Sequence, residues 1–436
     1  MEPILPELDY LACEPVQHAI LQRSHISVQP LVDTYKTGGD LKFEIKKSEH
    51  ATALHESYLR LRCKIVKADG TACDHAAESN PDNVSVINNV LHSMWKQVTV
   101  SLNGHEVEKI DDYPYRAYVT MLTSYSSEVL QKRGATHGWI KDTPDNFGEC
   151  GLGATAKNKG LEARTAPFKS SKEVELIGRI ESDVMNQGRN IPPDTLIEIC
   201  LSRTNNSFLL KSSAETGAYK LVITFAELEV ARDKLAPGLL KAQQEISRKS
   251  NLAIDYRHCK VLTYTVPMGV NTHKIEAFSS SCLPDRFVAF FVSNKAYSGL
   301  YAGNPFEFKH YGLNHFSATH LEQMNTVPHS GYKPDFAKKA VTYEYYSLLR
   351  EFDADEENFM LDLTRDEFAG GYAIYPFRFV HRTRGGDVLG PPASGTICLD
   401  IQFTNSLTEA VTLVLVADYR GSFEIRSTGD FVPPAA

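Results

Sequence analysis

Three histidines spaced five residues apart, His310, His315 and His320, come nearest to a metal-binding pattern in this chain. On an alternating strand, a step of five residues sends successive side chains to opposite faces of the sheet. The three rings converge only if a turn intervenes, for which Gly312 and Asn314 are suitable. A zinc site also requires a fourth ligand. The spacing therefore favours separate, hydrogen-bonded histidines, and we predict no metal site.

The acidic run 353–358 begins like a calcium-binding loop. Such a loop requires glycine at its sixth position and glutamate at its twelfth, whereas Asn358 and Thr364 stand there. A solvated helix end fits this run better. A weak structural calcium remains the alternative interpretation.

Catalytic patterns are missing from the sequence. It contains no GxSxG, GxxxxGK[ST] or HExxH motif. The run Gly148–Gly153 is similar to a nucleotide-binding fingerprint, but its spacing is wrong and it follows a Pro-Asp-Asn loop in place of a strand. The carboxylates Asp362, Asp366 and Glu367 are too close in sequence to form an opposed acid–base pair. We predict that the chain is not an enzyme, with no catalytic residues and no cofactor.

Basic and aromatic residues mix in the run Phe377–Arg384. On a strand, Arg378 points away from its apolar neighbours, which indicates a rim strand that ends in a charged loop. Arg382 and Arg384 add little affinity for nucleic acid at physiological salt, and the formal net charge is −8. We therefore predict no sequence-specific nucleic-acid binding.

Cellular location is constrained by the N-terminus, the apolar runs and the cysteines. The segment Met1–His25 lacks the apolar core of a secretory signal, and no apolar run approaches the ~20 residues that span a bilayer. The eight cysteines form no CxxC pair, and Cys63 and Cys398 sit inside strand patterns. We expect reduced thiols, synthesis in the cytosol or nucleus, no secretion and no transmembrane segment.

Short alternating strands are the main structural signal. Leu59–Ile65 alternates apolar with basic residues, and Val98–Leu102 runs into Asn103-Gly104, the dipeptide preferred in tight hairpins. Two other runs, Arg286–Ser293 and Val411–Ala417, are apolar on both faces. Such runs predict central strands covered on both sides, or strands at a subunit interface.

The pattern of elements occurs twice. Each half has several strands, then an amphipathic helix (Tyr113–Gln131 or Asp335–Asp353) that we expect to seal an open flank of a sandwich. Asp111 and Asp112 are suited to cap the first helix, and Asp335 the second. Each half then ends in what we expect to be a pair of strands: 195–203 with 219–232, and 396–404 with 411–427. This repetition predicts an all-β protein of two tandem sandwiches, each with one or two flanking helices.

The boundaries follow from the polar, helical segment between the halves. We predict an N-terminal arm at 1–25, a first sandwich at 26–232, a linker at 233–256 and a second sandwich at 257–436. Two polar loops, Lys67–Asp82 and Lys132–Ser170, are expected to be surface excursions.

Several stretches resemble the double jelly-roll major capsid proteins of eukaryotic double-stranded DNA viruses. The resemblance is nearest to the capsid proteins of Polinton (Maverick) elements and adintoviruses, and more distant to large nucleocytoplasmic DNA viruses and adenovirus hexon. It covers most of the chain as a pattern, without a short signature, and Trp95 stands where the family has phenylalanine. The segments that carry it are 86–95 with 97–104, 113–118 through Leu122 and Tyr125, 176–180 with Asp183, Gln187 and 191–193, 285–291 to 303–306, and 395–403 with Leu407.

The resemblance implies a structural protein of the virion. Two jelly rolls per chain would form a homotrimer with pseudo-sixfold symmetry, and these capsomers would tile an icosahedral shell around double-stranded DNA. Partners would be neighbouring capsomers and minor or penton capsid proteins. The loops Lys132–Ser170 and Tyr297–Pro305 would contact neighbours or form the outer crown, and the N-terminal arm would tie capsomers together. A disordered arm is an equal alternative.

Two other classes of protein remain open. A minor or vertex capsid protein with a single jelly roll should be shorter than this 436-residue chain. A carbohydrate-binding β-sandwich module should carry paired carboxylates or an aromatic platform.

Overall fold

Alternating apolar residues form the strands of both halves, and this alternation gives each sheet an inner, buried face. The structure is a computed structural model that describes residues 17–75, 82–153, 156–214, 217–352, 361–379, 393–426 and 431–432. The acidic run 353–358, the pair Arg382 and Arg384, Cys13 and most of the predicted N-terminal arm lie outside these residues.

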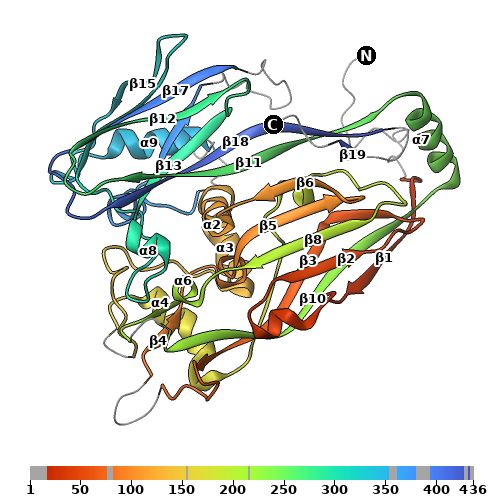
Figure 1. Cartoon of the computed structure of the whole chain (residues 1–436), viewed down its shortest axis with the longest axis horizontal. Helices are drawn as coiled ribbons and strands as arrows, with labels where there is room; N and C mark the ends of the chain where they lie inside the picture. Colours follow the sequence, from red (N-terminus) through yellow and green to blue (C-terminus); the bar gives the residue numbers. More distant parts are fainter. Residues whose placement is uncertain are drawn as a thin grey trace, which may run out of the picture.

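The first half forms two four-stranded antiparallel sheets (Figure 1). One has the order β1-β10-β3-β7 and the other the order β2-β8-β5-β6. Asn103 and Gly104 adopt positive φ between β5 and β6, which confirms the predicted hairpin. The strands are β1 Ile20–Val28, β2 Leu41–Ile45, β3 Ala51–Lys67, β5 Trp95–Leu102, β6 His105–Ile110, β7 Val174–Gly178, β8 Ile197–Arg203 and β10 Tyr219–Leu235.

The second half repeats this arrangement. One sheet has the order β11-β18-β13-β16, with the short β19 beside β18, and the other has the order β12-β17-β14-β15. The strands are β11 Leu252–Val266, β12 Thr272–Ser280, β13 Arg286–Ser293, β14 Leu313–His320, β15 Asn325–Tyr332, β16 Tyr375–Arg378, β17 Gly395–Phe403, β18 Val411–Ile425 and β19 Phe431–Val432.

The two halves share one strand order. With the separate ribbon of β4 (Val84–Val86) and β9 (Leu210–Ser212) set aside, one sheet of each half joins strands 1, 8, 3 and 6 of that half, and the other joins strands 2, 7, 4 and 5. This is jelly-roll topology, so the predicted all-β fold of two tandem jelly rolls is confirmed. The predicted pairing of the last two strands is wrong, because β8 and β10, like β17 and β18, lie in opposite sheets.

The first predicted helix is divided in two. It forms α2 (Tyr113–Ser124) and α3 (Ser127–Lys132), because Tyr125 is extended and the Ser126 hydroxyl caps the second helix. Asp112 occupies the N-cap position of α2, but its side chain makes no capping bond. Nearly all of α2 is buried, so this helix does not seal a flank as predicted; Figure 1 shows it between the two sandwiches.

The second predicted helix is shorter than expected. α9 spans Thr342–Glu351, while Asp335 forms a turn with Ala340 and caps no helix. Val341 and Leu348 are buried and α9 packs beside β16, which agrees with the predicted apolar stripe. The remaining helices are η2 Asp33–Thr37, α1 Val90–Ser93, η3 Gly134–His137, α4 Lys159–Thr165, η4 Ala166–Ser171, α5 Asp183–Asn186, α6 Asn206–Leu209, α7 Pro237–Lys249, α8 Asn294–Ser298 and α10 Arg365–Ala369.

Strands β13 and β18 pair at the centre of their sheet and are buried on both faces, as their sequences predict. Phe291 points inward, where its ring lies 5.7 Å from that of Phe316 in the facing sheet. Phe290 points outward, where its ring lies 6.0 Å from Tyr115 of α2. The ring of Phe308, from the second half, lies closer to Phe290 at 4.1 Å, so the covering on the outer face comes from both halves of the chain.

Candidate assembly site: the junction between the two sandwiches

The junction is built on the tyrosines of α2. Tyr118 stacks on Phe306 at 4.1 Å with an interplanar angle of 9°, and Tyr115 stacks on Tyr297 at 5.9 Å. Both stacking partners belong to the connection between β13 and β14 of the second sandwich. Aromatic pairs of this kind add about 0.5–1.5 kcal/mol beyond the area that they bury.

The segment Lys132–Ser170, predicted to be a surface excursion, has many exposed residues but also places a set of buried residues in the junction. Trp139, Phe147 and Leu161 are core residues, and a Cβ on Gly160 would lie 1.8 Å from the carbonyl oxygen of Lys141. The prediction is therefore wrong only for these buried residues, because the polar composition of the segment hid a few large apolar residues that supply its packing. These aromatic residues were the available signal in the sequence.

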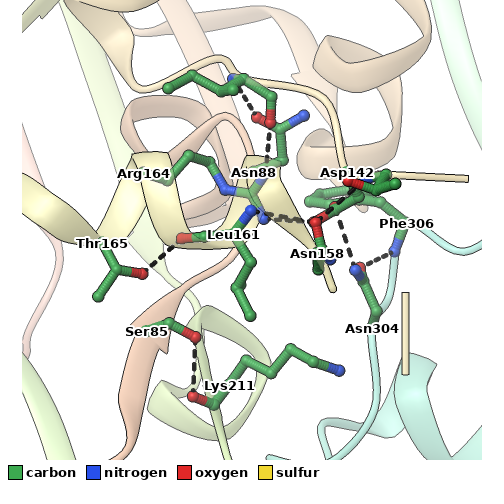
Figure 2. Close-up of polar contacts among 12 residues, drawn as sticks. Ser85, Asn88, Asp142, Asn158, Leu161, Arg164, Thr165, Lys211, Asn304 and Phe306 are labelled. Atoms are coloured by element: carbon green, nitrogen blue, oxygen red, sulfur yellow. Dashed lines mark hydrogen bonds and ion pairs between the residues drawn. The ribbon is translucent and has the colours of Figure 1, made fainter. Parts of the chain in front are cut away.

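A buried ion pair lies at the centre of this segment (Figure 2). Arg164 of α4 contacts Asp142 at 2.7 Å, and the two side chains are 1% and 0% exposed. The amides of Asn158 and Asn304 also donate to the Asp142 carboxylate, at 2.8 and 3.2 Å. Tyr372 donates to the Asp142 carbonyl at 3.2 Å. Because Asn304 and Tyr372 come from the second half, the network joins the two sandwiches through one residue, Asp142.

The loop Tyr297–Pro305, predicted to contact neighbours or to form the outer crown, also makes contacts within the chain. The Tyr301 hydroxyl donates to the carbonyl of Tyr219 at 2.6 Å, and Lys211 donates from Nζ to the carbonyl of Ala302 at 3.1 Å. The Tyr297 hydroxyl donates to Asp112 at 3.0 Å. Both loops therefore help to hold the sandwiches to each other, and their contacts with neighbours stay a prediction.

The carboxylates tested for catalysis have structural partners. Lys141 bridges Asp362 at 3.2 Å and Glu367 at 2.8 Å, and Ser127 donates to Asp362 at 2.5 Å. Glu367 also completes a capping box with Thr364 at the start of α10. Asp366 is exposed and does not join this group.

Charged residues of both halves meet beside α2. Arg116 of α2 contacts Asp183 at 2.7 Å, and Asp183 also accepts from the backbone N–H of Cys259 in β11 at 3.0 Å. Arg286 contacts Asp418 at 2.6 Å across β13 and β18. Burial opposes the charge of Asp418, but Arg286 and Arg116 outweigh it and hold the pKa of that carboxyl below its usual value. These groups line a cavity of about 180 Å³ between α2 and the sheet.

Glu108 adds a second buried carboxylate next to this cluster. It accepts hydrogen bonds from the backbone N–H groups of Asp183 at 2.9 Å and Val184 at 3.2 Å. Burial, followed by the negative charge of Asp183, raises the pKa of Glu108 to about 7. On the same strand, the carbonyl of Val107 accepts from the Tyr256 hydroxyl of the second half at 3.2 Å.

The three spaced histidines have separate environments. His310 stacks on Phe336 at 3.8 Å, His315 contacts Ser317 at 3.2 Å, and buried His320 lies 3.4 Å from Glu322. Within the described residues, no group of three or more His, Cys, Asp or Glu side chains is arranged to hold a metal. None of the helices in these same ranges is long and apolar enough to cross a membrane.

Sequence reasoning missed the residues that hold the junction together. Asp142, Arg164 and Asn158 carried no motif, since they lie 16 and 22 residues apart within an irregular segment and their partner Asn304 lies 162 residues from Asp142. Arg116 was hidden inside an aromatic helix. The run Gly148–Gly153 is a loop without regular structure in its described residues.

No known family model matches this chain. An uncharacterised protein from Caenorhabditis elegans is 21% identical over 381 residues, which cover 83% of this chain and 85% of that protein.

Solved structures show a stronger likeness in fold. A chain from the Sputnik virophage is similar over 100% of this chain and 93% of its own length, with a TM-score of 0.67 and 11% identity. The Faustovirus major capsid protein matches with a TM-score of 0.59, 8% identity and coverage of 100% and 93%. The mavirus major capsid protein matches with a TM-score of 0.54, 9% identity and coverage of 98% and 93%. The chain therefore has the double jelly-roll fold that these viral major capsid proteins share.

Proposed function

We propose that this chain is a structural major capsid protein. Three copies form a homotrimeric capsomer with pseudo-sixfold symmetry, and capsomers tile an icosahedral shell around double-stranded DNA. Its place is in the virion, after synthesis inside the host cell. The role requires no catalytic residue, metal or cofactor.

The observation that carries this proposal is the joining of two sandwiches of identical strand order into one body. Three such chains around a threefold axis present six similar sandwiches, which is the condition for a nearly hexagonal block. Closed cyclic symmetry of this kind is the usual way in which one chain builds a finite assembly. The buried bonds at the junction support the proposal because a tile must keep its two halves at a fixed angle.

We propose that the domains follow the predicted limits, with the first jelly roll at 26–232, a linker at 233–256 and the second jelly roll at 257–436. Strand β1 begins at Ile20 and pairs with β10, so part of the predicted arm already belongs to the first sheet. Helix α7 falls inside the proposed linker.

A Polinton (Maverick) or adintovirus origin is the finer part of the proposal. It is supported by the resemblance of the segments 86–104 and 285–306 to capsid proteins of these elements. The relative in an animal, Caenorhabditis elegans, fits an element that resides in animal genomes. A host gene derived from such an element is compatible with the same observations.

Contacts with neighbouring capsomers and with minor or penton proteins would use exposed parts of the loops Lys132–Ser170 and Tyr297–Pro305 together with other exposed surfaces. The second sandwich exposes several large apolar side chains that are suited to this purpose. They are Met268, Met324, Tyr343 and Tyr346. Exposed apolar residues at such positions are typical of surfaces that become buried on assembly.

Electron microscopy of the expressed chain tests the proposal. Negative-stain images of the purified full-length protein should show particles with a hexagonal outline, closed shells, or both. Images that contain only single, two-lobed molecules at every protein concentration would contradict it. The variant Glu149→Gln, which removes one member of an exposed pair with Lys157, is a matched control and should form the same particles.

A further inference from the structure

Helices α2 and α9 occupy the same place in the two sandwiches. Each is the first helix after the fifth strand of its half, so that α2 follows β6 and α9 follows β15. Each also carries two tyrosines three residues apart, Tyr115 and Tyr118 on α2 and Tyr343 and Tyr346 on α9. The second half therefore repeats this helix as well as the strands.

The two helices differ in how much of their surface is covered. α2 lies between the sandwiches, and nearly all of its residues are buried (Figure 1). α9 packs on β16 and α10 of its own sandwich and buries Glu344, Ser347 and Leu348. Its other side is open, because Tyr343 is 55% and Tyr346 is 51% exposed. Within one chain, α9 has a sandwich on one side only.

The junction inside the chain shows which strands cover such a helix. α2 packs beside β11 and β18, which are the first and eighth strands of the second sandwich. Arg116 of α2 and Asp418 of β18 line the same cavity there. Asp418 is the eighth of the 15 residues of β18, so the helix lies against the middle of that strand.

The first sandwich has an open surface at the corresponding strands. β1 and β10 are its first and eighth strands, and they pair antiparallel as β11 and β18 do. Around the middle of β10, the outward residues Phe225, Glu227 and Glu229 are half-buried or exposed. Glu227 bonds to Ser27 and Arg60 within the sheet, whereas the Glu229 side chain is 49% exposed. The middle of β10 thus presents an aromatic ring and an exposed carboxylate.

The open side of α9 is complementary to this surface in kind and in charge. Exposed Arg350 lies on the same side of α9 as the two tyrosines, and exposed Lys333 and Lys339 belong to the segment before the helix. Aromatic residues with a charged rim are typical of protein interfaces, and opposite charges across an interface favour the correct partner. A second copy of the chain supplies the matching surface.

A ring of six equivalent sandwiches requires one kind of contact throughout. Inside a chain, the helix of the first sandwich lies against strands one and eight of the second. In a closed ring of three chains, the helix of the second sandwich then lies against strands one and eight of the first sandwich in the next chain. This step rests on the proposed pseudo-sixfold capsomer.

We propose that the open side of α9 packs on the outer face of β1 and β10 in the neighbouring copy, with Tyr343 and Tyr346 at its centre and the basic residues beside α9 against Glu229. The contact is heterologous, since each chain gives its helix to one neighbour and its strands to the other. It places the two tyrosines inside the capsomer and leaves Met268 and Met324 for contacts between capsomers.

Light scattering coupled to size exclusion, over a dilution series of the full-length protein, tests this interface. Tyr346→Glu sets a negative charge against Glu229, and we expect the concentration at which half of the trimer dissociates to rise about tenfold or more. Glu229→Lys sets a positive charge against the basic rim and should shift it in the same direction. The double variant Tyr346→Glu/Glu229→Lys restores opposite charges and should regain part of the lost affinity, which separates direct contact from misfolding.

Two matched substitutions serve as controls. Ile246→Glu adds the same charge at an apolar residue of α7 that is 53% exposed. Glu175→Lys makes the same charge reversal on β7, at the other edge of the same sheet, where the side chain is 48% exposed. Neither should change the dissociation of the trimer.

The outcomes separate this interface from the proposed function. A wild-type trimer that Tyr346→Glu and Glu229→Lys leave unchanged overturns the interface and keeps the capsomer. Controls that weaken the trimer equally, or a double variant that regains nothing, also overturn it. A wild-type protein that stays monomeric at every concentration contradicts the proposed function itself, and the interface with it.

Discussion

The third strand of each sandwich holds the same place in the strand order, yet β3 and β13 differ in what lies on their outer faces. On β3 the outward residues are basic, and Arg60 contacts Glu175 on the neighbouring strand at 2.7 Å in a solvated ladder. On β13 the outward Phe290 is fully buried against α2. The same strand position is thus exposed to solvent in the first sandwich and lies in the junction in the second sandwich.

This difference shows how two copies of one topology become a single block. If both sheets kept a charged outer face, the halves would meet through solvated groups and could move as separate domains. Because only the sheet of the second sandwich has an apolar outer face, that face packs against the first sandwich and fixes the junction. The predictions below test this asymmetry, from the largest expected effect to the smallest.

Truncation of a side chain buried at the junction should cause the largest loss of stability. Phe290→Ala removes a fully buried ring between the sandwiches, and we expect it to lower the free energy of unfolding by about 3–5 kcal/mol. The matched variant Phe225→Ala, whose half-buried ring lies near Arg62 on the open sheet, should cost much less. Chemical denaturation of both variants measures the difference. Equal losses would show that the two outer faces are energetically alike.

Removal of the Asp142 charge, which joins the two halves, should cause the second-largest loss of stability. Asp142→Asn leaves Arg164 without its buried counter-ion, and loss of a charge-assisted hydrogen bond costs about 1.5–3 kcal/mol. Glu149→Gln, in the same segment but in an exposed pair, should change the free energy of unfolding by less than about 1 kcal/mol, as chemical denaturation measures. An unchanged free energy of unfolding for Asp142→Asn would show that this carboxylate does not stabilise the junction.

Acid should weaken the first sandwich through His137. Burial, together with the nearby positive charge of Arg133, lowers the pKa of His137 from 6.5 to about 4. Between pH 6.5 and pH 4, the unfolded chain binds a proton at His137 and the folded chain does not. The contribution of His137 to the free energy of unfolding is therefore fully present above pH 6.5 and is lost as pH decreases from 6.5 toward 4. His137→Gln should flatten this part of the curve of unfolding free energy against pH, and exposed His105→Gln should leave it unchanged. Identical curves for wild type and His137→Gln would refute the assignment.

The open face should tolerate substitution best. Arg60→Ala breaks contacts with Glu175 at 2.7 Å and Glu227 at 3.7 Å, and these partly exposed pairs are worth about 0–1 kcal/mol. Thermal unfolding in low and high salt measures the small loss, which salt should reduce further. A loss as large as that of Phe290→Ala would mean that this face is a second joint.

Local patterns in the sequence predicted much of the fold. Period-two alternation located strands such as β3, Asn103-Gly104 located a hairpin, and the apolar run at β13 indicated burial on both faces. These features depend on residues that are close in sequence. The repetition of elements was sufficient to predict two sandwiches.

Contacts between residues far apart in the sequence could not be predicted from local patterns. The last two strands of each half are consecutive, which suggested that they pair, but the jelly roll places them in facing sheets. Asp142 and Asn304 meet across 162 residues, and no local pattern marks such a contact. Polar composition also concealed the buried role of the segment 132–170, since Trp139 and Phe147 are few among many small residues.

The mass of the wild-type protein in solution tests the central claim, a homotrimeric building block, most directly. Light scattering coupled to size exclusion should give about 146 kDa, three times the chain mass of 48.6 kDa, or larger multiples of the trimer. A stable species of 48.6 kDa that persists at the highest concentrations would contradict the account.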